Sequence, residues 1–138
     1  GGARNHRGNL SDWVMVKDNH LTALGIVEAV RRARDAWPGR TVHVECERID
    51  QVVEALDAGA DAILLDNMSP EEVRACVVVA EEHAVSHGTR RALLEVSGGI
   101  TLETVGRYTE TGADVVSSGS LTNSSPVLDI GLDIEVHR

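Results

Sequence analysis

The sequence predicts an α/β fold in which parallel strands alternate with helices. Short apolar runs recur along the chain, and the segments between them place apolar residues at helical spacing. A weak internal repeat supports this prediction, because residues 58–64 and 111–116 each pass from a glycine that can end a helix directly into an apolar run. Strands separated by helices form parallel βα units with right-handed crossovers.

Five apolar runs are predicted strands, at residues 13–16, 41–46, 62–65, 92–96 and 115–117. The second run is rich in β-branched residues, which favour strands. The third run is apolar throughout, as in a strand that is covered on both faces. A further strand is predicted at 128–136, where apolar and polar residues alternate strictly, so this strand should be half exposed.

Four helices are predicted between these strands, at about residues 26–37, 49–58, 69–83 and 101–111. A Pro-Gly pair follows the first helix, and Gly59 follows the second. The third helix has the clearest start, because Ser69 can cap it and Glu72 completes a capping box. Thr101 is the expected cap of the fourth helix.

Parallel βα units build either an open doubly wound sheet or a (βα) barrel. A complete eightfold barrel needs roughly 200 to 250 residues. This chain has 138, and it starts at Gly1-Gly2 without an element to cover the first strand. We therefore expect an incomplete, atypical (βα) barrel over residues 1–125, the C-terminal part of a larger barrel protein, followed by a tail at 126–138.

Composition excludes several classes of function. The formal net charge of −9 argues against a surface that wraps nucleic acid. No apolar run approaches the roughly 18 residues of a membrane span, and no signal peptide opens the sequence, so a membrane is not an expected partner either. Cys46 and Cys76 lie in apolar surroundings and predict two buried thiols in a reducing cytoplasm.

Polar residues follow each of the five predicted strands of the sheet. Because the carboxyl ends of parallel strands meet at one edge of such a fold, we expect these residues to surround one site. They are Lys17, Asp18, Asn19 and His20 after the first strand, Glu45 near the end of the second, Asp66 and Asn67 after the third, and the turns Ser97-Gly98-Gly99 and Ser118-Gly119-Ser120 after the last two.

Lys17 is the single lysine beside twelve arginines and follows four apolar residues, which favours a functional role over that of a solvated charge. Glu45 and Asp66 offer hard oxygen atoms suited to Mg²⁺ or to sugar hydroxyls. Glu45 could instead pair with an arginine, and Asp66 could cap a helix. No mutual spacing suggests a metal site among the histidines His43, His83, His87 and His137.

The two glycine-serine turns, 97–99 and 118–120, predict a phosphate site. Glycine lets the backbone approach a ligand closely and leaves N–H groups free for an anion. A helix N-terminus nearby adds a potential that favours phosphate. Two such turns after successive late strands are similar to the phosphate site of many barrels.

Positive charge gathers just before the first predicted strand, at Arg4, His6 and Arg7. With Lys17 these residues form a cationic cluster inside an acidic chain. Such a local inversion of sign suits a small anion with several carboxylates or phosphates.

Seven blocks of the sequence form a specific set, in order over essentially the whole chain. They are Gly1-Gly2-Ala3-Arg4-Asn5-His6-Arg7, Val16-Lys17-Asp18-Asn19-His20, Val44-Glu45-Cys46, Leu64-Leu65-Asp66-Asn67-Met68, Glu95-Val96-Ser97-Gly98-Gly99-Ile100, Gly119-Ser120-Leu121-Thr122 and Leu128-Asp129-Ile130. Together they resemble the signature blocks of the quinolinate phosphoribosyltransferase family, also called nicotinate-nucleotide pyrophosphorylase (carboxylating).

The resemblance implies the transfer of phosphoribose from phosphoribosyl pyrophosphate to the nitrogen of quinolinate. Decarboxylation follows and gives nicotinate mononucleotide, pyrophosphate and CO₂, in de novo NAD biosynthesis with Mg²⁺. The resemblance also implies a cytoplasmic homo-oligomer, a dimer or larger, with an N-terminal α/β sandwich domain that this chain lacks. Residues 126–138 would join that domain, and the 138 residues alone should show no turnover.

The family's functional residues match positions of this sequence. By motif match, His6, Arg7 and Lys17 bind the two carboxylates of quinolinate. Glu45 and Asp66 face the ribose hydroxyls and Mg²⁺, and together with Lys17 they are the candidate catalytic residues. The residues that would hold the phosphate are Ser97, Gly98, Gly99, Ser118, Gly119, Ser120 and Asn123.

Two positions depart from the family pattern, and two other functions fit the residues. Asn123 stands where many members carry histidine, and His43 stands where an acidic residue is frequent. We expect the His43 side chain to point away from Glu45. The first alternative function is a Schiff-base aldolase or decarboxylase that uses Lys17 on a phosphate-binding barrel. The second is a non-catalytic domain that binds a phosphorylated ligand.

Overall fold

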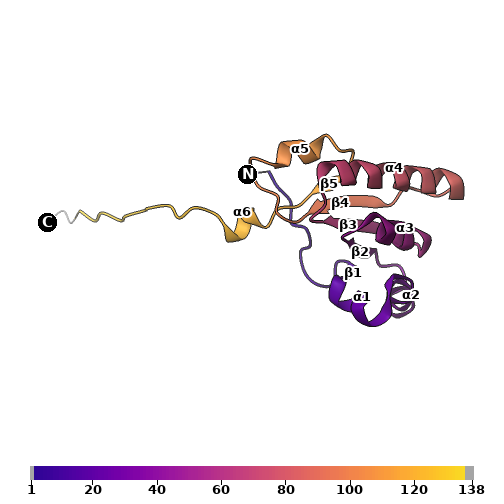
Figure 1. Ribbon diagram of the computed structural model, residues 1–138. Helices are drawn as coiled ribbons and strands as arrows, with labels where there is room; N and C mark the ends of the chain where they lie inside the picture. Colours follow the sequence, from indigo (N-terminus) through magenta and orange to yellow (C-terminus); the bar gives the residue numbers. More distant parts are fainter. Residues whose placement is uncertain (1, 136–138) are drawn as a thin grey trace.

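A parallel five-stranded sheet forms the centre of the structure, a computed structural model that describes residues 2–135 of the chain (Figure 1). The strands are β1 (Val14–Val16), β2 (Val42–Cys46), β3 (Ala62–Asp66), β4 (Leu93–Ser97) and β5 (Val115–Val116). All five lie where the apolar runs predict them, so the α/β fold class is confirmed.

Six helices are described within residues 2–135, and none of them is long and apolar enough to cross a membrane. They are α1 (Asp18–Leu24), α2 (Ile26–Ala36), α3 (Ile49–Asp57), α4 (Pro70–His87), α5 (Val105–Thr109) and α6 (Ser120–Asn123). The predicted start of α4 is confirmed, because the Ser69 side chain accepts a hydrogen bond from the Glu72 N–H.

The strand order β1-β2-β3-β4-β5 follows the chain, with every neighbouring pair parallel. Figure 1 shows α2, α3 and α4 stacked beside the strands in the same order. Right-handed crossovers that all advance in one direction keep their helices on one face of the sheet, as in a barrel, whereas a doubly wound sheet reverses direction. The five strands are therefore part of a (βα) barrel.

The two faces of the sheet differ in composition. One face packs against α2, α3 and α4 and is fully apolar; its buried residues are Val42, Val44, Cys46, Ile63, Leu65, Leu94 and Val96. The opposite face, called the inner face here, carries His43, Glu45 and Glu95, all buried. The expectation that His43 points away from Glu45 is wrong, because residues two positions apart in a strand share a face.

Two of the predicted helices need correction, and the structure contains two further helices. Residues 18–24 form α1, which was not predicted, and α4 continues beyond residue 83 to His87. The fourth predicted helix starts at Val105 and not after Thr101, whose N–H donates to Thr104 Oγ1 (2.9 Å) and so closes a turn ahead of α5. The short helix α6 follows the last glycine-serine turn and was not predicted.

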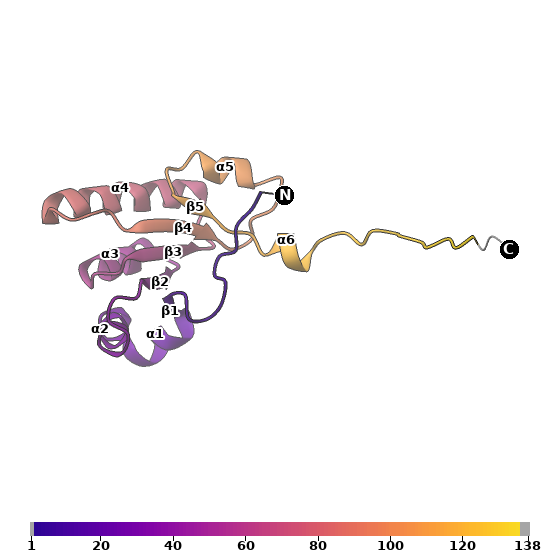
Figure 2. The same ribbon diagram turned by 180° about the vertical axis from the view of Figure 1, so that it is seen from behind.

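The predicted tail strand does not form in the described part of the tail. Residues 124–135 contain no helix or strand and extend away from the sheet (Figure 2). A strand needs a neighbour to satisfy its backbone groups, and this tail extends away from the other strands. The expectation that residues 126–138 join another domain stays a prediction, and residues 136–138 lie outside the described ones.

Both cysteines are free and buried, as predicted. Burial raises the pKa of the Cys46 thiol to about 12 and that of the Cys76 thiol to about 11. Thiols with raised pKa values are poor nucleophiles and poor metal ligands at neutral pH. Cys46 and Cys76 therefore act as small apolar residues in the core between the sheet and the helices.

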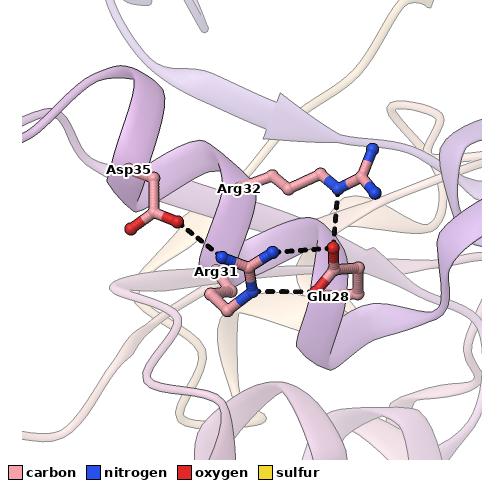
Figure 3. Close-up of polar contacts among 4 residues, drawn as sticks. All are labelled: Glu28, Arg31, Arg32 and Asp35. Atoms are coloured by element: carbon pink, nitrogen blue, oxygen red, sulfur yellow. Dashed lines mark hydrogen bonds and ion pairs between the residues drawn. The ribbon is translucent and has the colours of Figure 1, made fainter.

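The solvent-facing side of α2 carries a network of charges (Figure 3). Arg31 and Arg32 both donate to the Glu28 carboxylate, and Arg31 also donates to Asp35 at 2.7 Å. Hydrogen bonds from the two arginines lower the pKa of Glu28 to about 2. These arginines pair with carboxylates on the solvated surface of α2, so they do not supply positive charge to the inner face.

We predict that His43 makes the chain less stable in acid. Burial lowers the pKa of His43 to about 4 from an ordinary value of 6.5. Between these two pH values the unfolded chain binds a proton that the folded chain refuses, so the free energy of unfolding falls as the pH falls. Urea unfolding at several pH values in this range should show a smaller fall for His43→Gln than for the unaltered chain.

The matched control is His87→Gln, which changes an exposed histidine on α4. It should leave the fall in unfolding free energy close to that of the unaltered chain. Equal falls in His43→Gln and the unaltered chain would contradict the prediction.

Candidate active site

Lys17 and Glu45 form an ion pair at the carboxyl ends of β1 and β2. Lys17 Nζ lies 3.1 Å from Glu45 Oε2, and their side chains are 50% and 10% exposed. The mostly buried carboxylate thus has a cation to compensate its charge, while the lysine keeps half of its surface open to a ligand. The N–H of Lys17 donates to His20 Nδ1 (2.9 Å), which fixes the backbone where β1 passes into α1.

A polar hollow of about 290 Å³ adjoins this pair. It lies between the N-terminal parts of α1 and α3, and its lining is Asp18, Leu21, Thr22, Glu45, Glu47 and Gln51. Carboxylate, hydroxyl and amide oxygens dominate this lining, so the hollow suits hydroxyl groups or a hard cation more than an apolar ligand.

Asp66 ends β3 and stands in register with Ser97 at the end of β4. The Asp66 carboxylate accepts a hydrogen bond from Asn67 Nδ2 at 2.7 Å. The Asn67 N–H in turn donates to the carbonyl of Ser97 at 3.0 Å. The segment after β3 is therefore fastened to the first predicted phosphate turn.

Gly98 is required by close backbone contact. Its φ is +86°, and a Cβ at this position would lie 2.6 Å from the backbone nitrogen of Asn67. Asn67 itself has a φ of +55°, which is uncommon outside glycine. Glycine at position 98 thus lets the loop after β4 pack closely against the loop after β3, in addition to any close contact with a ligand.

The second predicted phosphate turn packs against the first. Ser118 Oγ donates to the carbonyl of Ile100 (2.6 Å) and lies 2.7 Å from Ser120 Oγ. Asn123 follows one turn later in α6, where its N–H donates to the carbonyl of Gly119 at 3.0 Å. Residues 97–100 and 118–123 are therefore neighbours, as the sequence predicts. The N-terminus of α5 does not directly follow the first turn, because α5 begins only at Val105.

A second cluster of ionisable groups lies on the inner face, around Glu95 of β4. His6 Nδ1 is 2.7 Å from Glu95 Oε1, and the Ser117 hydroxyl donates to the same oxygen. His43 Nε2 is 3.7 Å from the other oxygen, Glu95 Oε2. The Trp13 ring lies beside both imidazoles, with centroids 5.3 Å from His6 and 4.9 Å from His43.

Three atoms of this cluster have no hydrogen-bond partner among the described residues: both ring nitrogens of His43 and Glu95 Oε2. The side chains of His43 and Glu95 are 0% and 1% exposed. The sequence patterns do not single out Glu95 as a site residue, because it stands inside an apolar run. A glutamate inside an apolar run is itself the signal that could have identified this residue, because glutamate is almost never fully buried without a partner.

The predicted cationic cluster is divided in the structure. Lys17 contacts Glu45 on β2, whereas His6 contacts Glu95 on β4. Arg7 lines a separate hollow of about 470 Å³ along β1, with Leu10, Ser11, Trp13, Val14, Met15, Trp37 and Arg40. His6 and Lys17 thus share the inner face with β3 between them, and Arg7 lines its hollow together with Trp13, whose ring contacts His6 and His43.

The strand ends and the parallel register place Lys17, Asp66 and the two turns at one edge of the sheet. Glu45, Leu64 and Glu95 stand side by side in the register of β2, β3 and β4. In both ribbon views the N-terminal segment runs from near α5 past these strand ends toward β1. The structure therefore gathers Lys17, Glu45, Asp66, His6 and the two turns along one edge and one face of the sheet.

Comparison with known proteins identifies the family. The family model for the quinolinate phosphoribosyl transferase C-terminal domain matches residues 1–133. The nicotinate-nucleotide pyrophosphorylase (carboxylating) of Homo sapiens is 43% identical over 136 residues, which are 97% of this chain and 44% of that protein. A probable enzyme of the same name from Methanothermobacter thermautotrophicus is 41% identical, over 97% of this chain and 48% of its own length. The chain thus spans about half the length of these relatives.

Solved structures agree with this result. A nicotinate-nucleotide pyrophosphorylase from Ehrlichia chaffeensis has a TM-score of 0.85 and 40% identity, covering 98% of this chain and 47% of that one. Thiamine phosphate pyrophosphorylase from Pyrococcus furiosus, at 16% identity and a TM-score of 0.58 over 76% of this chain and 48% of that one, shares the fold alone. The chain therefore belongs to the quinolinate phosphoribosyl transferase family, within which it matches the C-terminal domain.

Proposed function

We propose that this chain supplies part of the active site of an enzyme that joins phosphoribose, from phosphoribosyl pyrophosphate, to the nitrogen of quinolinate. Loss of CO₂ then gives nicotinate mononucleotide, with pyrophosphate as the other product. The observation that carries the proposal is the ion pair of Lys17 and Glu45 at the carboxyl ends of β1 and β2, inside a domain that matches the family over residues 1–133.

The charges suit this reaction. Departure of pyrophosphate leaves positive charge on the ribose, which the Glu45 and Asp66 carboxylates stabilise from the strand ends. The half-exposed ammonium of Lys17 binds a carboxylate of quinolinate, together with His6. The pyridine nitrogen is already nucleophilic, so the site needs no base to activate it. The turns at 97–99 and 118–120, with Asn123, hold the phosphate.

Mg²⁺ fits the donor set of the strand ends. Glu45 and Asp66 offer carboxylate oxygens, and the hollow beside Glu45 also presents Asp18 and Glu47. Glu45 and Asp66 would hold the ion, directly or through water, together with substrate phosphates. When bound there, it neutralises negative charge on the leaving pyrophosphate.

The tail supports a larger assembly. Val127, Leu128, Ile130, Leu132 and Ile134 are 74–95% exposed, which is costly for aliphatic side chains unless another surface covers them. We propose that a second domain of the full protein covers this tail, and that the full protein works as a cytoplasmic homo-oligomer, a dimer or larger. Of the two alternative functions, Schiff-base chemistry is disfavoured, because the Glu45 carboxylate contacts Lys17 Nζ at 3.1 Å and occupies the atom that would have to attack a carbonyl group.

We expect the 138 residues alone to give no turnover of quinolinate and phosphoribosyl pyrophosphate. The inner face carries groups that would bind substrate, but the chain spans about half of the relatives' length. Other residues of the active site would therefore come from the rest of the full protein. Product formation is measured for the chain and for the full protein under the same conditions. Steady formation of nicotinate mononucleotide by the chain would contradict this expectation.

Lys17→Ala should weaken quinolinate binding by the full protein by roughly tenfold or more, because it removes a carboxylate-binding cation and leaves Glu45 unpaired. Calorimetric titration measures the affinity. Arg74→Ala is the matched control: it removes a cation that pairs with Glu71 on the outer surface of α4, and it should leave the affinity unchanged. Unchanged affinity in Lys17→Ala would remove Lys17 from the site.

Glu95→Gln should raise the KM for quinolinate roughly tenfold, with a smaller change in kcat and little change in the KM for phosphoribosyl pyrophosphate. Glu95 acts here as a positioning residue, because its carboxylate receives His6 Nδ1–H and so turns the other ring nitrogen toward the substrate. Ser117→Ala removes the hydroxyl that donates to the same Glu95 oxygen but keeps the carboxylate, so its effect on the KM for quinolinate should be smaller.

A merely structural role for Glu95 would lower thermal stability and affect both substrates alike. If Glu95→Gln changes the two KM values equally, the positioning role is wrong.

A further inference from the structure

The C-terminal ends of α3 and α4 bring together three potential metal ligands. Asp57 is the last residue of α3, while His83 and His87 lie one turn apart at the end of α4. One ligand atom from each of the three lies within 4.8 Å of the others. By sequence alone, no spacing among the histidines suggests a metal site. Residues four apart nevertheless share one face of a helix, and α3 adds a third potential ligand.

The contacts among these groups are short. His83 Nε2 lies 3.2 Å from Asp57 Oδ1, and the two imidazole rings stack with their centroids 4.1 Å apart and their planes 22° apart. A metal ion between His83 and Asp57 would replace the proton that joins them. The stacked ring of His87 brings a third ligand atom within 4.8 Å of the other two.

The tautomer of His87 is set by its own hydrogen bond. His87 Nδ1 is 2.9 Å from the carbonyl oxygen of His83, which can only accept, so Nδ1 carries the proton. Nε2 of His87 therefore holds the free lone pair. Metal-bound histidines commonly use their second nitrogen in this way, donating to a carbonyl that fixes the ring.

The local electrostatics favour a cation. Both helices present their C-terminal ends, where the helix dipole is negative, and Asp57 adds carboxylate oxygens. The Asp57 side chain is 60% exposed and that of His83 is 18% exposed, so an ion can reach the group from solvent without rearrangement of the core.

This position is remote from the candidate active site. In parallel βα units the helix C-termini lie at the end of the sheet where the strands begin, opposite the edge that carries Lys17 and Asp66. Figure 2 shows the end of α4 on the side of the sheet away from α6. The other convergent group, His6, His43 and Glu95, belongs to the site already described.

We propose that Asp57, His83 and His87 form a binding site for a divalent transition metal of the zinc class. Two imidazole nitrogens and one carboxylate oxygen, completed by water, match the tetrahedral coordination of Zn²⁺. Imidazole selects such ions over Mg²⁺, which prefers oxygen ligands alone. Because the ligands come from two neighbouring helices, the bound ion ties the end of α3 to the end of α4.

The test uses the full protein, freed of metal by dialysis against a chelator and titrated calorimetrically with zinc chloride. We expect one equivalent of Zn²⁺ to be lost, or bound at least about tenfold more weakly, in His87→Gln and in Asp57→Asn. Zn²⁺ should also raise the Tm of the unaltered protein more than that of either variant, since an ion that binds only the folded state stabilises it.

Glu71→Gln is the matched control, an exposed carboxylate at the opposite end of α4, and it should bind zinc like the unaltered protein. The proposal is overturned if the unaltered protein takes up no zinc, or if His87→Gln binds zinc with the same affinity and stoichiometry. Neither outcome bears on the proposed transferase activity, because the variants lie at the far end of the helices.

Discussion

One packing constraint underlies the structure: every crossover of the sheet runs in the same direction, so all covering helices lie on one side. That side becomes an aliphatic layer in which Val44, Ile63 and Leu94 are fully buried. The residues that alternate with them must then face the other way. Polar side chains that do not fit an aliphatic core, such as Glu45 and Glu95, therefore lie together on the inner face, and they are positioned by the strands themselves.

The two carboxylates on the inner face each have a polar partner, and each pair joins distant parts of the sequence. Glu45 meets Lys17 across neighbouring strands, and Glu95 meets His6 from the N-terminal segment. A buried carboxylate without such a partner would cost several kcal/mol. The same contacts that make the carboxylates tolerable also present a lysine and a histidine to the space beside the sheet, so the stability of this face and its capacity to bind anions depend on the same side chains.

Patterns in the sequence predict the strands well, because a short apolar run between two helices usually forms a buried strand. They also predict that Lys17, Asp66 and the glycine-serine turns gather at one edge, since strand ends alone decide this. They fail for α1 and α6, where polar residues after a strand resemble turns as much as helices. They fail too for Glu95 and for its contact with His6, because that contact depends on which way an irregular segment folds over the sheet.

The contact between Gly98 and Asn67 has a mechanical consequence. A Cβ at position 98 would lie 2.6 Å from the backbone nitrogen of Asn67, and the Asn67 N–H donates to the Ser97 carbonyl, so the two loops are packed tightly against each other. The end of β3 and the first glycine-serine turn are therefore fastened to each other. Whatever the site holds, backbone packing sets the spacing between the end of β3 and this turn before any ligand arrives.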